Sequence, residues 1–270
     1  MAKIIDFPDV DKLKEEVKSL RKELVSLIFS HDDRISHEAI RVEAEYLEEF
    51  GLREYKVMNL NLTVKKLKEE KRLVEDFIRR DEPVDFYNIF KIVSSEFTKD
   101  EEILRDKLTV IGSLDKYAQR HSLSDKSLEE LNNSYIKIID KINPLVNPDL
   151  SLEEWDLYKD ALDAFTNYEP YFLGAIADIV DDNYHKEYYL RPNDSLYAEK
   201  IRLTAAIEEI KDSIEEISKA YPLNLKKFLV DKKARRSKNE ILNKRIASLK
   251  EARRSLEEDL KILLEAYNDC

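Results

Sequence analysis

The sequence predicts an elongated, all-α protein, and three observations lead to that prediction. Charged residues make up 38% of the 270 residues, and the chain has only 3 Gly and 7 Pro. Apolar residues recur every three or four positions over long stretches, which is the spacing of one face of an α-helix. No stretch alternates apolar and polar residues over the length of a useful strand. Long helices with narrow apolar stripes fit this composition better than a thick globular core.

The first segment, 1–82, is expected to form N-terminal coiled-coil helices. A helix over 9–30 carries apolar residues at coiled-coil spacing, namely Val10, Leu13, Val17, Leu20, Leu24 and Leu27. A second helix is predicted over 36–50. Gly51 then follows as the left-handed residue that ends many helices. A third helix is predicted over 52–80.

The next two segments are a long connecting helix and a helical hairpin. Segment 83–122 is expected to form one helix over 84–120. In segment 123–191 a first helix ends before a turn with two prolines, 143–150, and a second helix opens at Ser151, where Glu154 completes a capping-box pattern. A further helix over 171–189 should pack on this hairpin. The predicted hairpin core consists of Leu131, Tyr135, Ile138, Tyr158, Leu162 and Phe165.

The last segment, 192–270, is expected to form an antiparallel coiled-coil hairpin. Its first arm carries apolar residues from Leu203 to Tyr221, and its second arm carries them from Leu242 to Tyr267. The two arms are joined by a turn that contains proline, as in an αα-hairpin. Apolar seams seldom stay uncovered in water, so we expect a homodimer in preference to a monomer that covers its own seams.

The start of the second arm is strongly basic, with twelve Lys or Arg against three Asp or Glu over 226–254. One interpretation is intramolecular, because flanking charges commonly pair across coiled coils. The facing acids would be Glu208, Glu209, Asp212, Glu215 and Glu216. The other interpretation is a basic flank for nucleic acid, anionic lipid or an acidic partner. Its candidate contact residues are Lys232, Lys233, Arg235 and Arg236.

The sequence contains several short runs of residues whose order along the chain is more informative than any single run. They are Glu43-Ala44-Glu45-Tyr46-Leu47 with Gly51 and Glu54-Tyr55-Lys56-Val57, then Tyr135-Ile136-Lys137-Ile138-Ile139, Asn147-Pro148-Asp149-Leu150-Ser151 and the segment 158–165, then Tyr221-Pro222-Leu223-Asn224-Leu225-Lys226. With these runs the chain resembles poorly characterised helical proteins of Gram-positive bacteria that carry a J-domain-like hairpin between coiled-coil segments. The resemblance implies a bacterial, chaperone-related protein.

The loop of the hairpin departs from that family's working pattern. A working J-domain has His-Pro-Asp between its two main helices, and this tripeptide stimulates the heat-shock ATPase. The corresponding residues here are Asn143, Pro144 and Leu145, and leucine has neither the charge nor the acceptor oxygens of aspartate. The resemblance therefore implies the hairpin shape without the co-chaperone activity. We take Asn143, Pro144, Leu145, Asn147 and Asp149 as candidate partner-binding residues; the alternative is a proline-stiffened helix connection.

No catalytic, cofactor or metal site is predicted. The histidines at 31, 37, 121 and 185 lie far apart, and His31-Asp32-Asp33 lacks the partner residues of metal phosphohydrolases. Glycine-rich phosphate loops are absent, and the single cysteine, Cys270, has no evident base beside it.

We expect a non-catalytic helical scaffold or adaptor that binds another protein. The alternatives are a nucleic-acid-associated accessory protein that uses the basic arm, and a residual chaperone-cofactor role. The net charge of −11 argues against nucleic-acid binding by the chain as a whole. The sequence has no apolar run of membrane-spanning length, so a cytoplasmic protein is expected.

Overall fold

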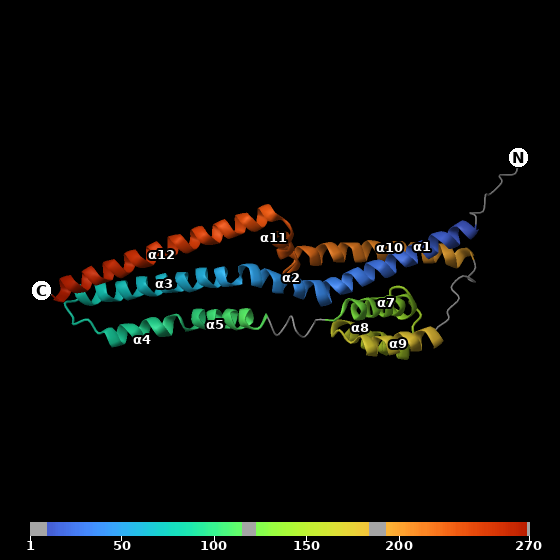
Figure 1. Cartoon of the computed structure of the whole chain (residues 1–270), viewed down its shortest axis with the longest axis horizontal. Coiled ribbons are helices and arrows are strands. Elements are labelled where there is room, and N and C mark those ends of the chain that lie inside the picture. The colour runs from blue at the N-terminus through green and yellow to red at the C-terminus, as the bar shows by residue number, and fades with distance from the viewer. Residues whose placement is uncertain (1–9, 115–122, 184–192, 269–270) are drawn as a thin grey trace. The chain divides into compact units, whose positions relative to one another are not determined.

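A computed structural model describes residues 10–114, 123–183 and 193–268, and every element in those ranges is helical. The all-α prediction is therefore confirmed. The chain divides into two compact units (Figure 1). Unit 1 comprises Met1–Val42 and Arg120–Asn224, and unit 2 comprises Glu43–Gln119 and Leu225–Cys270. Each unit thus combines an N-terminal and a C-terminal part of the chain.

Unit 1 is built around the parallel pair of helices α1 (Val10–Asp33) and α10 (Asn193–Lys219). Four side-chain hydrogen bonds join α10 to α1 and to the turn that follows α1, and the sequence separation of the partners stays between 182 and 188. A constant separation means that the helices run in the same direction. The contacts are Glu16–Lys200, Glu23–Lys211, His31–Ser213 and Arg34–Ser218.

The hairpin of unit 1 forms as predicted. Helices α7 (Asp125–Ile142) and α8 (Leu152–Thr166) contact each other in antiparallel sense, because Tyr135 meets Phe165 while Asn143 meets Tyr158. Five of the six predicted core residues are buried and Leu162 packs against them. The capping box at Ser151 is also present.

The remaining elements of unit 1 are a helix on the hairpin and a short irregular turn of helix. Helix α9 (Pro170–Asn183) packs against α7 as predicted, while residues 184–189 of that prediction lie outside the described part. After α1, a π-helical turn, η1 (Arg34–Glu38), leads directly into α2 (Ala39–Tyr46).

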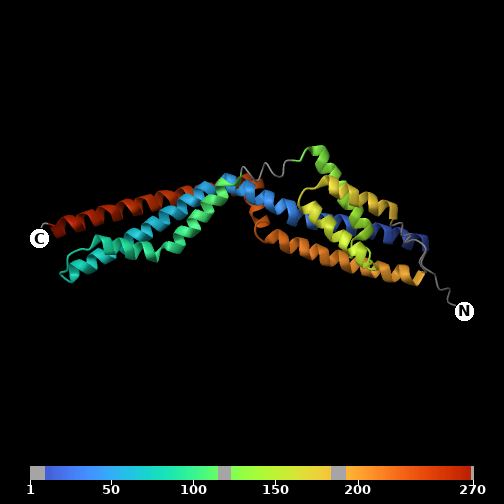
Figure 2. The same ribbon diagram turned by 90° about the horizontal axis from the view of Figure 1, so that it is seen from below.

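Unit 2 repeats the parallel pairing with different helices. Helix α3 (Leu52–Arg79) lies along α12 (Lys232–Asn268), and polar partners on these two helices and on the residues that flank α3 are separated by 184 to 190 residues. Helices α4 (Phe86–Glu96) and α5 (Thr98–Gly112) run along α3, as Figures 1 and 2 both show. The short helix α11 (Lys226–Val230) precedes α12.

The predicted hairpin of segment 192–270 is wrong in its pairing. Its first arm, α10, packs along α1 in unit 1, and its second arm, α12, packs along α3 in unit 2. An apolar stripe requires a partner helix, but its spacing does not specify which helix. The stripes that suggested a homodimer are consequently covered within each unit and give no reason for a second copy of the chain.

The predicted helix end at Gly51 is also wrong. Gly51 has a helical φ of −53°, and the π-helical turn η2 (Leu47–Gly51) passes directly into α3. A Cβ atom at position 51 would lie 3.2 Å from Cγ1 of Ile111 on α5, so the glycine permits a close approach between helices. The left-handed residue that ends a helix is Asp81, with a φ of 57°, just after α3.

The predicted connecting helix over 84–120 is two helices where the structure describes it. The backbone leaves helical geometry at Phe97, which ends α4 and precedes the first residue of α5. The hydroxyl of Thr98 donates to the carbonyls of Ser94 and Ser95, a side-chain bond that competes with helix continuation. Residues 115–120 lie outside the described part.

Candidate partner-binding site at the hairpin loop

The loop between α7 and α8 is shaped by two buried asparagines that the sequence had suggested as partner-binding residues. The side-chain oxygen of Asn143 accepts a hydrogen bond from the backbone N–H of Leu145 at 2.8 Å, and its amide donates to the Tyr158 hydroxyl at 2.7 Å. The first bond mimics a backbone turn. Asn143 is only 3% exposed, so its side chain serves the loop and does not face outward.

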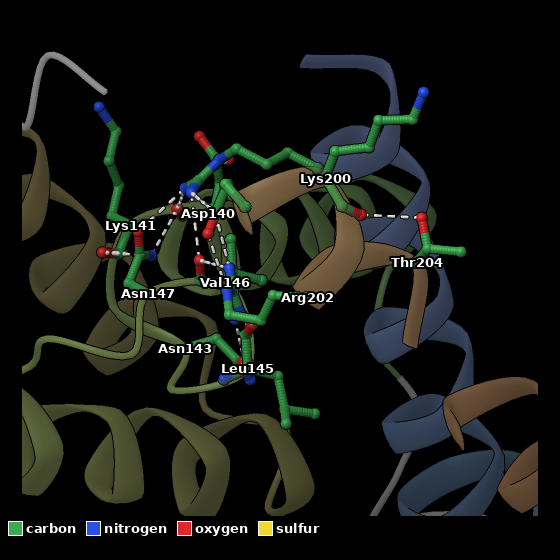
Figure 3. Close-up of polar contacts among 11 residues, drawn as sticks. Asp140, Lys141, Asn143, Leu145, Val146, Asn147, Lys200, Arg202 and Thr204 are labelled. Atoms are coloured by element: carbon green, nitrogen blue, oxygen red, sulfur yellow. Dashed lines mark hydrogen bonds and ion pairs between the residues drawn. The ribbon is translucent and has the colours of Figure 1, made fainter. Parts of the chain in front are cut away.

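Asn147 closes the other side of the loop. Its side-chain amide donates to the carbonyls of Asp140 at 2.9 Å and Lys141 at 2.8 Å, near the end of α7 (Figure 3). Such carbonyls have no partner within the helix and need an external donor when buried. Asn147 is fully buried, so it too is a structural residue of the loop.

Arg21 of α1 holds the loop from one side. Its guanidinium donates to the carbonyl of Val146 at 3.1 Å, to the carbonyl of Asp140 at 3.1 Å and to the side-chain oxygen of Asn147 at 3.0 Å. Arg21 is buried, and its charge lies 4.0 Å from the buried carboxylate of Glu199. Three bonds from one buried cation fix the loop backbone firmly against α1.

Arg202 of α10 holds the loop from a second helix. It donates to the carbonyls of Leu145 at 2.5 Å and Val146 at 3.1 Å, and Figure 3 shows it reaching the loop backbone at these two residues. A bidentate pair with Glu199, at 2.7 and 2.8 Å, orients its guanidinium. Glu199 therefore lies beside both arginines that grip the loop.

Sequence reasoning missed this arginine clamp, which consists of Arg21, Arg202 and Glu199. A signal for Arg21 was available, because it lies four residues after Val17 and three before Leu24, on the apolar stripe of α1. A charge on a buried stripe requires a polar partner. For Arg202 we see no comparable signal in the sequence.

The other three candidate residues lie on the outward side of the loop. Leu145 is 41% exposed, Asp149 is exposed and Pro144 is half-buried. In the first turn of α8, Leu152 is 84% exposed and Trp155 is 43% exposed. The structure thus separates the five candidates into two that build the loop and three that lie at its surface.

The basic candidate residues at the start of α12 also divide into two kinds. Arg235 donates to the carbonyls of Phe228 and Leu229 and thereby caps the C-terminal end of α11. Lys232, Lys233 and Arg236 are exposed, and of these Arg236 pairs with Glu240 one helical turn away. The intramolecular interpretation of the basic charge is wrong in its partner, because α12 lies along α3, and Lys238 pairs with Glu54 there.

A chain of polar side chains crosses the core of unit 1. The Ser213 hydroxyl lies 3.1 Å from Nε2 of His31, whose Nδ1 lies 3.0 Å from the Asp32 carboxylate. Asp32 also accepts a 2.7 Å bond from the Tyr135 hydroxyl. Burial raises the pKa of Tyr135 well above its usual value, and burial raises that of Tyr158 to about 12.

Ser213, His31 and Asp32 are hydrogen-bonded in the order of a hydrolytic triad, but the groups around them pack helices together. Ser213 lies within α10, where backbone N–H groups bond to carbonyls of the same helix. No pair of amides is therefore free to stabilise an oxyanion beside it. We assign this chain of bonds to the joining of α1, α7 and α10.

His37 joins the π-helical turn η1 to the end of α8. Its Nε2 bonds to the carbonyl of Phe165 at 2.9 Å, and its ring stacks on Tyr168 with centroids 4.0 Å apart. Tyr168 has a φ of 58° and ends α8. Within the described ranges no group of three His, Cys, Asp or Glu is arranged to hold a metal ion; His121, His185 and Cys270 lie outside those ranges.

Comparison with protein-family models, with curated proteins and with solved structures gave no match to this chain. In the part of the chain that the structure describes, every helix is too short or too polar to span a membrane.

Proposed function

We propose that this protein is a non-catalytic helical adaptor that binds another protein through the outer side of the α7–α8 loop. The observation that supports the proposal is the arginine clamp. Two arginines from different helices, together with Asn143 and Asn147, hold the loop backbone, while Leu145 remains at the surface.

A loop that is fixed before binding loses little conformational entropy when a partner binds. Leu145, Leu152 and Trp155 supply apolar surface of the kind that forms the centre of protein interfaces. The partner we expect is therefore a protein with an apolar pocket or groove that accepts Leu145.

The J-domain-like reading of the hairpin remains part of this proposal. Asn143 occupies the place of the histidine of a working J-domain, and it is buried and bonded within the loop. Leu145, in the place of the aspartate, is exposed but carries no charge. These two features support a hairpin that binds without stimulating a heat-shock ATPase.

The test is affinity capture from the cells that produce the protein, with a matched pair of variants. Leu145→Ser removes the exposed side chain at the loop, and Ile201→Ser removes one that is 58% exposed on α10. We expect a partner that is retained by the unchanged chain and by Ile201→Ser but lost with Leu145→Ser. Equal retention by both variants would show that the loop is only a connection between helices.

A second candidate function, nucleic-acid binding by α12, is favoured by one observation. The exposed cations Lys232, Lys233, Lys244, Arg245 and Lys250 have no ion-pair partner among the described residues. Because α12 lies along α3, the acids of α10 that sequence reasoning assigned to them are not their partners.

This candidate is tested by retention on heparin and on duplex DNA at low and moderate salt. Phosphate contacts made by these lysines would give binding that weakens steeply with salt. Lys232→Glu with Lys233→Glu should abolish retention. The charge-matched control, Lys126→Glu with Lys159→Glu in unit 1, should not change it. Equal effects of the two double substitutions would show that retention depends on the overall charge of the protein and not on α12.

A further inference from the structure

Helix α4 has apolar residues over a wide arc, and only part of that arc is covered. Ile89 and Val93 are buried in a core that also includes Val74 of α3 and Leu260 of α12. Beside this buried stripe Phe86 is 55%, Tyr87 79% and Phe90 71% exposed. An apolar stripe of a helix normally faces a core. The exposed aromatic side of α4 therefore lacks a partner in the described part of the chain.

The exposed area is large enough to contribute to a stable interface. An aromatic side chain offers about 150–250 Å², so the exposed fractions of the three rings amount to roughly 400 Å². That is within the range of the largest apolar patch on a typical monomer, which is often functional. It is also about half of the ~800 Å² that each partner buries in an interface of standard size.

Helix α5 extends the apolar surface. Ile103 and Val110 lie seven residues apart, hence on one side of the helix, and are 54% and 47% exposed. The acidic residues at the start of α5 are used inside unit 2, because Asp100 pairs with Lys65 and Glu101 with Lys66. They fix α5 against α3 and leave the outer side available.

The charges beside this surface indicate which partner fits it. On this side of α4 and α5 the exposed charged residues are of both signs and have no ion-pair partner among the described residues: Lys91 and Lys99 against Asp85, Glu102 and Asp106. A twofold interface brings the same patch of two copies together, so a patch with both signs can complement itself. An anionic membrane would instead require an excess of cations.

The total charge of the chain strengthens this choice. With a net charge of −11, two copies repel each other over most of their surface. A largely apolar patch with charges of both signs is where that repulsion is weakest. We propose that the outer side of α4 and α5, centred on Phe86, Tyr87 and Phe90, binds the same surface of a second copy of this chain. This inference is independent of the proposed adaptor function.

Light scattering and sedimentation equilibrium of the whole chain at micromolar concentration test the proposal. The unchanged chain should have twice the 31.9 kDa mass of one copy. Phe90→Glu should raise the dissociation constant at least tenfold, because a carboxylate would be buried in the interface. The matched control, Tyr171→Glu on α9, changes a side chain that is 92% exposed and should leave the dimer intact. Circular dichroism confirms that each variant is folded.

A monomer at all concentrations up to 100 µM would overturn the proposal, and so would a dimer that survives Tyr87→Glu combined with Phe90→Glu. A charge exchange tests the choice of partner separately. One variant carries Glu at Lys91 and Lys99, and another carries Lys at Glu102 and Asp106. Each should be monomeric alone, and an equimolar mixture should form the mixed dimer. Failure of the mixture to associate would refute a self-complementary surface. A complex of the unchanged chain with a different protein, found in place of the dimer, would also refute it.

Discussion

Removing Arg21 should destabilise unit 1 more than the loss of one exposed arginine normally does. Arg21→Ala deletes donors to the carbonyls of Val146 and Asp140 and to the side-chain oxygen of Asn147. The Val146 carbonyl keeps a bond from Arg202, and the Asp140 carbonyl keeps one from Asn147. Among the described residues, the fully buried oxygen of Asn147 has no other donor.

The magnitude follows from that count. A hydrogen bond from a charged donor contributes about 1.5–3 kcal/mol, and a buried acceptor without a donor costs about 1–3 kcal/mol. We therefore expect Arg21→Ala to reduce the free energy of unfolding of unit 1 by about 3 kcal/mol. Arg202→Ala should cost less, about 2 kcal/mol, because its guanidinium is partly exposed and water replaces its bond to Leu145.

The double variant gives the sharper test, because the two arginines share acceptors. Together they supply two donors to the Val146 carbonyl and two cations beside the buried Glu199. The combined loss should exceed the sum of the single losses by about 1–2 kcal/mol.

The assay is urea unfolding followed by the fluorescence of Trp155, the single tryptophan, which lies in α8 and reports on unit 1. Arg236→Ala, an exposed arginine of unit 2, should change the signal by no more than about 0.5 kcal/mol. Additive effects within about 0.5 kcal/mol, or a loss from Arg21→Ala no larger than that of the control, would refute the clamp.

Three further predictions concern other parts of the molecule. Asn143→His with Leu145→Asp should not confer stimulation of a heat-shock ATPase, because position 143 is buried; a steady-state ATPase assay showing stimulation would contradict this. Tyr158 has a pKa raised to about 12, so folding favours its neutral form, and unit 1 should lose stability as the pH rises from 10 to about 12; tryptophan fluorescence during alkaline titration should show a smaller loss for Tyr158→Phe, because Tyr135, whose pKa burial also raises, still contributes. Gly51→Leu should destabilise unit 2 by about 2 kcal/mol through overpacking against Ile111, and thermal melting followed by circular dichroism should show partial recovery with Ile111→Ala.

Local structure was predictable from the sequence because its causes are local. Ser151 and Glu154 are three residues apart, and their capping box forms as their chemistry dictates. The hairpin core follows from the apolar spacing of α7 and α8, and the short connection between them leaves few ways to pair.

The pairing of distant helices was not predictable by the same means. Helices α10 and α12 carry similar stripes, and nothing in the spacing distinguishes α1 or α3 from the neighbouring arm as a partner. Charged partners such as Lys71 and Asp259 lie 188 residues apart, a distance over which sequence patterns carry no register. The predicted helix end at Gly51 was wrong for a related reason. The glycine is explained by its close approach to the side chain of Ile111 on another helix.

The sequence predicted the position of the candidate site but not its internal structure. The loop 143–149 was recognised from its prolines and asparagines, which favour turns. The roles of Asn143 and Asn147 depend on Tyr158 and on Arg21, and such contacts appear only after the chain has folded.

The nearly constant separation of 178 to 190 residues between partners on paired helices determines how long one helix of a pair is synthesised before the other. Ribosomes add about 5–20 residues per second, so α1 waits on the order of 10–40 s before α10 exists to cover it. During that interval Leu24 and Ile28, both buried in the finished protein, face water on the nascent chain. The hairpin of α7 and α8 is synthesised in the meantime and can fold from local contacts. Cellular factors that shield nascent apolar helices should therefore determine how much of this protein reaches its native state.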